Sequence, residues 1–484
     1  MRGRLDALLL ATAIAPHTSS IGLVPTITTT HTEPFHVATG VQTLDYVSEG
    51  RAGWRVQVSG RAHEAAHVGR RTLPALDPAL VVLGTDPAQT ALIEDLFGEA
   101  RDAVEVARRL WDSWEDDAVI RDVETGRFVD REKLHYIDFV GDRFTVEGPS
   151  ITPRPPQGQP LVYALAHQKV PYELAVAGAD IVGVTPHDDA HLEAILGQLE
   201  TAAHDVVRGV DEPLRVWTEI SVLIEKTVDA AHATLDRLNA THGEPWTSDT
   251  VILADTPEAV AAQAPALALP RYRRCPAAAG AAAGGPHGDH RARCSAAACR
   301  RGARPSGRSR DPSRPTRIRS PREPLRDPCR HRPRRRLHPR ARPDRKHPLM
   351  TTTASTTAHP IAQDASGRPL RQVHLAAHFP GVNNTSVWSD GKAESQIAFS
   401  SFRHFAQNAE RGKFDFLFLA EGLRLREQKG LIHDLDVVGR PNTLAILAGI
   451  AAVTEHIGLV GTLRLDVQRT VRTRQAAREP RPAE

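Results

Sequence analysis

Apolar and polar positions along residues 21–59 predict a βαβ unit. Residues 21–24 form a short apolar run that passes into a cluster of hydroxyls, namely Thr26, Thr28, Thr29 and Thr30. Pro34 suits the first turn of a helix, which apolar positions carry as far as the break at Gly50. Residues 53–58 then predict a second strand. Because such units bind ligands beyond the carboxyl ends of their strands, the threonines are candidate ligand contacts.

Apolar runs and helical periods keep alternating downstream, which indicates a parallel sheet covered by helices. The pattern predicts helices at 92–117, 172–177, 188–207, 227–239 and from about 256, and strands at 160–166, 179–184 and 214–220. Residues 60–92 follow neither period and predict an irregular segment.

A second alternating segment begins at residue 371. It predicts strands at 371–378, 414–419 and 457–463, with a helix at 399–411 and another before 457. Residues 440–463 agree with residues 4–27 at 10 of 24 positions, including the run IGLV. The same helix-and-strand element therefore closes one segment and opens the other, as expected if two overlapping pieces of one fold were joined in swapped order.

Composition separates the two segments. By count, residues 271–348 hold 24 Lys or Arg against 5 Asp or Glu, although the whole chain carries a formal charge of only +3. This stretch is dominated by Arg, Ala, Pro and Gly without a period, which predicts disorder. It also contains all the cysteines, Cys275, Cys294, Cys299 and Cys329, and none forms a CxxC pair. Neither a disulfide framework nor a metal site is predicted.

The first fifteen residues superficially resemble a signal peptide, but Asp6 interrupts the apolar region and the segment has a twin at 440–463. No apolar run reaches the length of about 18 residues that a membrane span needs. We therefore expect a cytoplasmic protein.

Two stretches carry a resemblance to a known family. Residues 21–54 read IGLVPTITTTHTEPFHVATGVQTLDYVSEGRAGW, and residues 109–118 read RLWDSWEDDA. Both resemble the flavin-dependent monooxygenases of the bacterial luciferase-like family, in the branch that acts on nitrilotriacetate, EDTA and dibenzothiophene sulfone.

The resemblance implies a TIM (β/α)8-type barrel, here incomplete and in swapped order. It also implies that residues 117–156 are an insertion with a small hairpin ahead of the strand at 160. Residues 1–263 would supply strands 3 to 7 and residues 371–465 strands 1 to 3, separated by a disordered basic linker at 264–370 and followed by a disordered tail at 466–484. Seven different strands are visible where such a barrel needs eight. The implied activity is FMNH2-dependent monooxygenation of a small organic molecule through a C4a-peroxyflavin. A separate NAD(P)H-dependent flavin reductase would supply reduced FMN, with O2 as co-substrate.

The resemblance also places candidate site residues, although it assigns no catalytic acid or base. They are Glu421, Thr26, Thr28, Thr29, His167 and Gln168 for the flavin, and Asn384 and Trp388 for the substrate. The residues alone leave simpler interpretations open: a solvated glutamate at a strand end, threonines in turns, and a tryptophan in the core.

Three positions depart from the family pattern. Ile93 and Phe97 stand where close relatives have a polar helical pair, and Arg55 stands where relatives have Asn. These departures bear on flavin affinity. Two alternative functions therefore stay open: an inactive fusion of two partial reading frames, and a protein that contacts nucleic acid through the Arg-rich insert. The sequence does not decide whether the chain forms a homo-oligomer.

Overall fold

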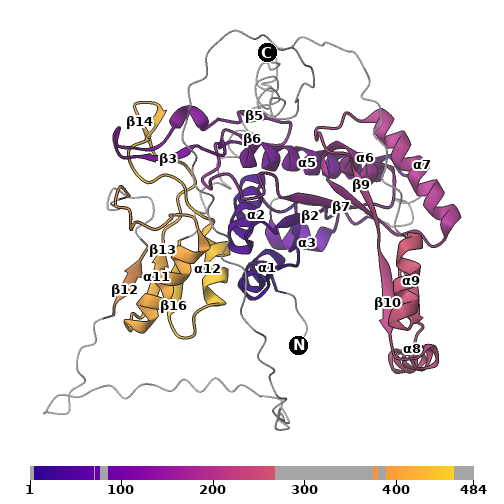
Figure 1. The fold of residues 1–484 in the computed structure, drawn as a ribbon. Helices are drawn as coiled ribbons and strands as arrows, with labels where there is room; N and C mark the ends of the chain where they lie inside the picture. Colours follow the sequence, from indigo (N-terminus) through magenta and orange to yellow (C-terminus); the bar gives the residue numbers. More distant parts are fainter. Residues whose placement is uncertain (1–4, 70, 77–84, 268–373, 380–387, 463–484) are drawn as a thin grey trace, which may run out of the picture. The chain divides into compact units, whose positions relative to one another are not determined.

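Parallel strands and helices alternate through both segments in the computed structural model (Figure 1). The structure describes residues 5–69, 71–76, 85–267, 374–379 and 388–462. Beyond residue 267 the predicted linker lies outside the described residues up to 370, and so do the predicted tail at 466–484 and Asn384. Residues 5–267 and 374–462 belong to one compact unit.

The N-terminal segment contains the predicted elements in order, together with α3 and β11, which the pattern does not predict. Its helices are α1 (Ala7–Ile14), α2 (Pro34–Ser48), α3 (Ala62–Val68), α5 (Pro87–Trp111), α6 (Lys169–Gly178), α7 (Asp189–Asp205), α8 (Val228–His242) and α9 (Pro257–Leu267). Its main strands are β1 (Thr26–Thr28), β2 (Gly53–Gln57), β7 (Leu161–Leu165), β8 (Ile181–Val184), β9 (Arg215–Thr218), β10 (Ile220–Ile224) and β11 (Val251–Asp255). Two small hairpins, β3 (Val119–Asp122) with β4 (Arg127–Val129) and β5 (Phe139–Val140) with β6 (Thr145–Val146), form the predicted insertion.

Five of these strands form one parallel sheet in the order β1-β2-β7-β8-β9. Helices α2, α5, α6 and α7 pack in succession, each against the next. Their buried apolar side chains share one core cluster with Val56, Val162 and Val182 of the sheet. One face of the sheet is therefore covered by helices, and the other face carries both polar side chains and the buried Ile181.

The C-terminal segment forms a second parallel sheet in the order β12-β13-β16. Its elements are β12 (Ala376–His378), α11 (Phe399–Arg411), β13 (Phe416–Leu419), a hairpin of β14 (Glu427–Gln428) and β15 (Leu431–Ile432), α12 (Thr443–Ala451) and β16 (Gly458–Gly461). The predicted helix at 399–411 is confirmed.

The duplicated element is present twice. β1 pairs with β2 at the edge of one sheet, and β16 pairs with β13 at the edge of the other. The helices that precede them, α1 and α12, pack against each other, and both contact α2. Both copies are therefore folded, rather than one copy displacing the other.

The two segments meet in a common core and through buried polar contacts. Ile446 and Ile450 of α12 belong to the same apolar cluster as Val41 and Leu44 of α2. The Asn442 amide donates to the Thr43 hydroxyl at 2.8 Å, and the Arg440 amide donates to the Ile151 carbonyl at 2.8 Å. The swapped segments therefore dock on one another within a single chain.

The prediction of a barrel is met only at the level of an α/β fold with parallel sheets. Within the described ranges the strands form separate sheets and no closed barrel. The predicted strand at 214–220 is divided at Glu219: β9 pairs with β8, whereas β10 pairs with β11 in a two-stranded parallel sheet. β11 was missed because its five half-buried residues show no alternation.

Two helix predictions need correction. α5 begins at Pro87 instead of residue 92, because the Asp86 carboxylate caps its polar first turn by accepting from the Ala88 and Gln89 amides. It ends at Trp111, before the predicted end at 117. Residues 60–92 are not wholly irregular, since they contain α3. Among the described helices, none is long and apolar enough to span a membrane.

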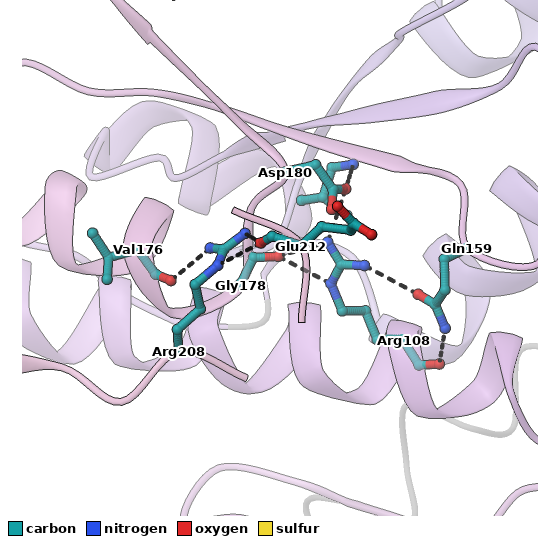
Figure 2. Close-up of polar contacts among 8 residues, drawn as sticks. Arg108, Gln159, Val176, Gly178, Asp180, Arg208 and Glu212 are labelled. Carbon is teal, nitrogen blue, oxygen red and sulfur yellow. Dashed lines mark hydrogen bonds and ion pairs between the residues drawn. The ribbon is translucent and has the colours of Figure 1, made fainter. Parts of the chain in front are cut away.

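A network of arginines joins the amino ends of β7, β8 and β9. Figure 2 shows the Arg108 guanidinium donating to the Gly178 carbonyl, to Asp180 and to Gln159. Asp180 Oδ2 also accepts from the Val162 amide at 2.7 Å. Arg208 ties the Val176 carbonyl to the Glu212 carbonyl. Side chains at the amino ends of barrel-type strands serve stability and leave the opposite ends for ligands.

Candidate functional site

The face of the five-stranded sheet opposite the helices carries polar and aromatic side chains, together with the buried Ile181. Partners in a parallel register point to the same side, so β1, β2 and β7 place Thr26, Arg55 and Tyr163 in one row across the sheet. The next row toward the carboxyl ends contains Thr28 and Trp217. We call this surface the polar face of the sheet.

Tyr163 lies along this face and reaches past β8. Its phenol donates to the carboxylate of Glu219, which follows β9. A Cβ atom at Gly183 would overlap the phenol oxygen, so only glycine leaves room for the ring there. The Trp217 ring lies 6.4 Å from the Tyr163 ring, between centroids, and is 54% exposed. The result is an aromatic surface that crosses three strands.

Arg55 adds a cation to the same face. Its guanidinium carbon lies 6.0 Å from the centroid of the Tyr163 ring, and its Nε is buried without a hydrogen-bond partner. Throughout the described part of the chain, no carboxylate lies within ion-pair distance of Arg55. The neighbouring Gln57 amide donates instead to the Val58 carbonyl. Among the described residues, this half-buried positive charge therefore has no anion as a partner.

The phenol of Tyr163 gives the face a pH dependence. Burial, followed by the hydrogen bond to Glu219, raises the pKa of Tyr163 above its usual 10.0. Above that pH the unfolded chain loses the phenol proton while the folded chain keeps it, so this contribution to stability falls as pH rises. We expect Tyr163→Phe to reduce the loss of stability between about pH 9 and about pH 10.5, measured by urea unfolding. Equal losses in both proteins would contradict this.

The three threonines predicted to contact the flavin have different surroundings in the structure. The Thr26 and Thr28 hydroxyls face the polar face and make no hydrogen bond with other described residues. Thr29 is buried, and its hydroxyl donates to the Gln57 carbonyl at 3.2 Å. Two hydroxyls are therefore open to a ligand, whereas the third supports the turn after β1.

His167 and Gln168 follow the carboxyl end of β7, as predicted. The His167 ring contacts the Thr185 hydroxyl at 3.1 Å and lies 3.9 Å from Asp249. Gln168 is the N-cap of α6, and its side chain makes no capping hydrogen bond. The first amide groups of α6 therefore lack a side-chain acceptor at the position where helices bind anions.

Glu421 lies in a different sheet from Thr26 and Thr28. It follows β13, and its amide donates to the hydroxyl of Thr462 at 2.7 Å. Glu421 also attracts the Arg440 guanidinium, whose pKa burial lowers. The backbone of Glu421 is thus held by the C-terminal copy of the duplicated element, whereas the open hydroxyls belong to the N-terminal copy.

Trp388 packs against the insertion. Its ring lies 5.7 Å from that of Phe128, between centroids, and its Nε1 donates to the Leu435 carbonyl at 3.0 Å. It borders the cluster that contains Trp114 and Ile432. These contacts account for its position through packing, and its contact with a substrate stays a prediction. Of the two departures on α5, Phe97 packs partly buried against the main core.

The sequence pattern does not show that Tyr163, Trp217 and Glu219 belong to one surface. Each was read as part of a strand, and their common face depends on a register that no single strand reveals. The signal that could have found two of them is a charged or aromatic residue at every second position, as in RVWTE, where Arg215, Trp217 and Glu219 alternate with Val216 and Thr218.

Comparison with known proteins decides the family. The model of the luciferase-like monooxygenase family matches residues 1–300, more than half of the chain. The chain belongs to the luciferase-like monooxygenase family. This agrees with the resemblance carried by residues 21–54 and 109–118, and it makes the chain a relative of enzymes.

Among curated relatives of this luciferase-like chain, N-acetyl-S-(2-succino)cysteine monooxygenase of Bacillus subtilis (strain 168) is 32% identical over 231 residues, covering 48% of each protein. Nitrilotriacetate monooxygenase component A of Aminobacter aminovorans is 33% identical over 229 residues, covering 47% of each. The chain thus spans about half the length of these relatives. A solved long-chain alkane monooxygenase shares 24% identity over 54% of this chain and 65% of that one, with a TM-score of 0.45.

Proposed function

We propose that this chain is an FMNH2-dependent monooxygenase that inserts one oxygen atom from O2 into a small organic molecule. Family membership supports the reaction class. The observation that carries the proposal is the pair of open hydroxyls on β1: Thr28 ends the strand, at the side where α/β folds bind ligands, and Thr26 lies two residues before it on the same face. The relative named component A supports a separate flavin reductase as the partner.

The donors on this side of the sheet suit a flavin. Thr26 and Thr28 would hold the edge of the isoalloxazine ring, whose carbonyls and ring nitrogens accept hydrogen bonds. The amino end of α6, at Gln168 with His167 beside it, would meet the phosphate. Glu421 would join these donors if β13 and β1 belong to one barrel, and we propose that the two sheets close in this way. We also propose that the chain is divided into barrel segments at 1–263 and 371–465, a linker at 264–370 and a tail at 466–484.

When bound, reduced FMN supplies the electrons that activate O2. The residues of this chain then have three tasks: to bind the ring, to orient the substrate beside it and to exclude water. Tyr163 and Trp217 provide an apolar surface for the second and third tasks, because aromatic rings exclude water and hold ligands with few polar contacts.

The experiment that tests the proposal supplies purified chain with FMN, NADH, a flavin reductase, 18O2 and nitrilotriacetate or an aromatic sulfone. We expect one 18O atom in the product, and Thr26→Val combined with Thr28→Val to weaken FMNH2 binding by about tenfold. If no 18O enters the added compound, and if the Thr26→Val, Thr28→Val double variant binds FMNH2 as tightly as the unaltered chain, the result would favour the inactive fusion.

A further inference from the structure

The polar face contains a cation without an anion. Arg55 is half-buried, its Nε is buried without an acceptor, and the described residues place no carboxylate within ion-pair distance. Its contact with Tyr163, at 6.0 Å, lies at the outer limit of a cation–π interaction and satisfies no N–H group. Taking a charge out of water is unfavourable unless a counter-charge or hydrogen bonds offset it. This position is therefore poor for stability and good for binding an anion.

The neighbours of Arg55 define what else the ligand contacts. Tyr163 lies beside it in the same row, and its phenol is already bonded to Glu219. Beyond Tyr163 the Trp217 ring is largely exposed. Glu219 belongs to the same face, so negative charge is repelled from that end and attracted to the end at Arg55. The face therefore has a cation at Arg55, aromatic rings in its middle, and at the carboxyl end of β9 a carboxylate that repels an anion.

We infer that Arg55 binds the carboxylate of an organic acid whose apolar body lies over Tyr163 and Trp217. A guanidinium offers parallel N–H groups that match the two oxygens of a carboxylate. This inference rests on the proposed function and deepens it, since it names the substrate class as an organic carboxylate with an apolar body. The phosphate of FMN presents the same anion chemistry and is the competing occupant.

The test measures binding to the full chain by isothermal titration calorimetry without any flavin. The probes are phenylacetate and its neutral counterpart phenylacetamide. We expect the acid to bind at least about tenfold more tightly than the amide, and Arg55→Gln to remove this preference. Arg215→Gln is the matched control, because Arg215 points to the same face at the start of β9 but is exposed.

A second readout separates a binding role from a structural one. Because the Arg55 charge lacks a protein partner, Arg55→Gln is expected to leave the melting temperature of the ligand-free chain unchanged or higher. A lower melting temperature, or equal preference for the acid in the Arg55→Gln and Arg215→Gln proteins, would overturn the inference.

The flavin arm uses FMN and riboflavin. If FMN binds more tightly than riboflavin only while Arg55 is present, and phenylacetate does not bind, then Arg55 holds the flavin phosphate and the carboxylate assignment is wrong. Because calorimetry requires no turnover, retained preference for phenylacetate in a chain that fails the 18O2 experiment would support this inference while rejecting the proposed activity.

Discussion

Arg108→Ala is expected to lower the free energy of unfolding by about 3 kcal/mol, the size typical of breaking a buried pair. The Arg108 side chain is only 11% exposed, and that of Asp180 is 24% exposed. The guanidinium donates to the Gly178 carbonyl at 2.8 and 3.0 Å, to Asp180 at 2.9 Å and to Gln159 at 3.1 Å. Alanine would remove the guanidinium from the Gly178 carbonyl and leave the Asp180 carboxylate with the Val162 amide but without its counter-charge, in a part of the fold from which water is largely excluded.

Urea unfolding followed by circular dichroism measures this effect. Arg101→Ala is the matched control, because Arg101 is exposed on the same helix and its loss should change nothing measurable. Asp180→Asn keeps an acceptor for the Val162 amide while it removes the charge, so it should destabilise less than Arg108→Ala. Equal stability of the Arg108→Ala and Arg101→Ala proteins would mean that the network contributes little.

The sequence predicted elements better than their partners. β7 and β8 are nearly continuous runs of apolar and aromatic residues, so the sequence alone identifies them as buried strands. By contrast, Glu219 separates two strands that pair with different neighbours, which no local pattern records. The start of α5 was misplaced for a related reason, since the Asp86 cap lies in a polar turn that the apolar spacing does not reach.

For the candidate site, sequence reasoning reached single residues but not their grouping. It selected Thr26 and Thr28 from the strand-loop-helix pattern and from resemblance, and both lie on the polar face of the sheet. It regarded Arg55 only as a departure from the family pattern. The charge became informative once the register placed it beside Tyr163 with no carboxylate nearby. A residue that departs from the family pattern, as Arg55 does, is thus a candidate for changing which ligand is bound when its side chain has no partner within the fold.

Separately expressed residues 1–270 and 371–484 are expected to copurify when one piece carries an affinity tag. The two segments share one apolar cluster, and Gly449 of α12 approaches α2 so closely that an added Cβ would lie 3.3 Å from Val47 and 3.0 Å from Phe399. The leucine side chain of Gly449→Leu should therefore overpack this contact. The free energy of association of the two pieces should become less favourable by about 3 kcal/mol, which weakens their affinity by about a hundredfold.

The variants distinguish docking from folding of the smaller piece. Leu444→Ala changes the same helix at a side chain that is 42% exposed, and it should leave the affinity unchanged. Val47→Ala in the larger piece makes room on α2, so it should partly restore binding of the Gly449→Leu piece, because neighbouring changes couple. If Val47→Ala restores nothing, the damage lies against Phe399 within the smaller piece. If the unaltered pieces do not copurify at all, the covalent connection and not the shared core holds the swapped segments together.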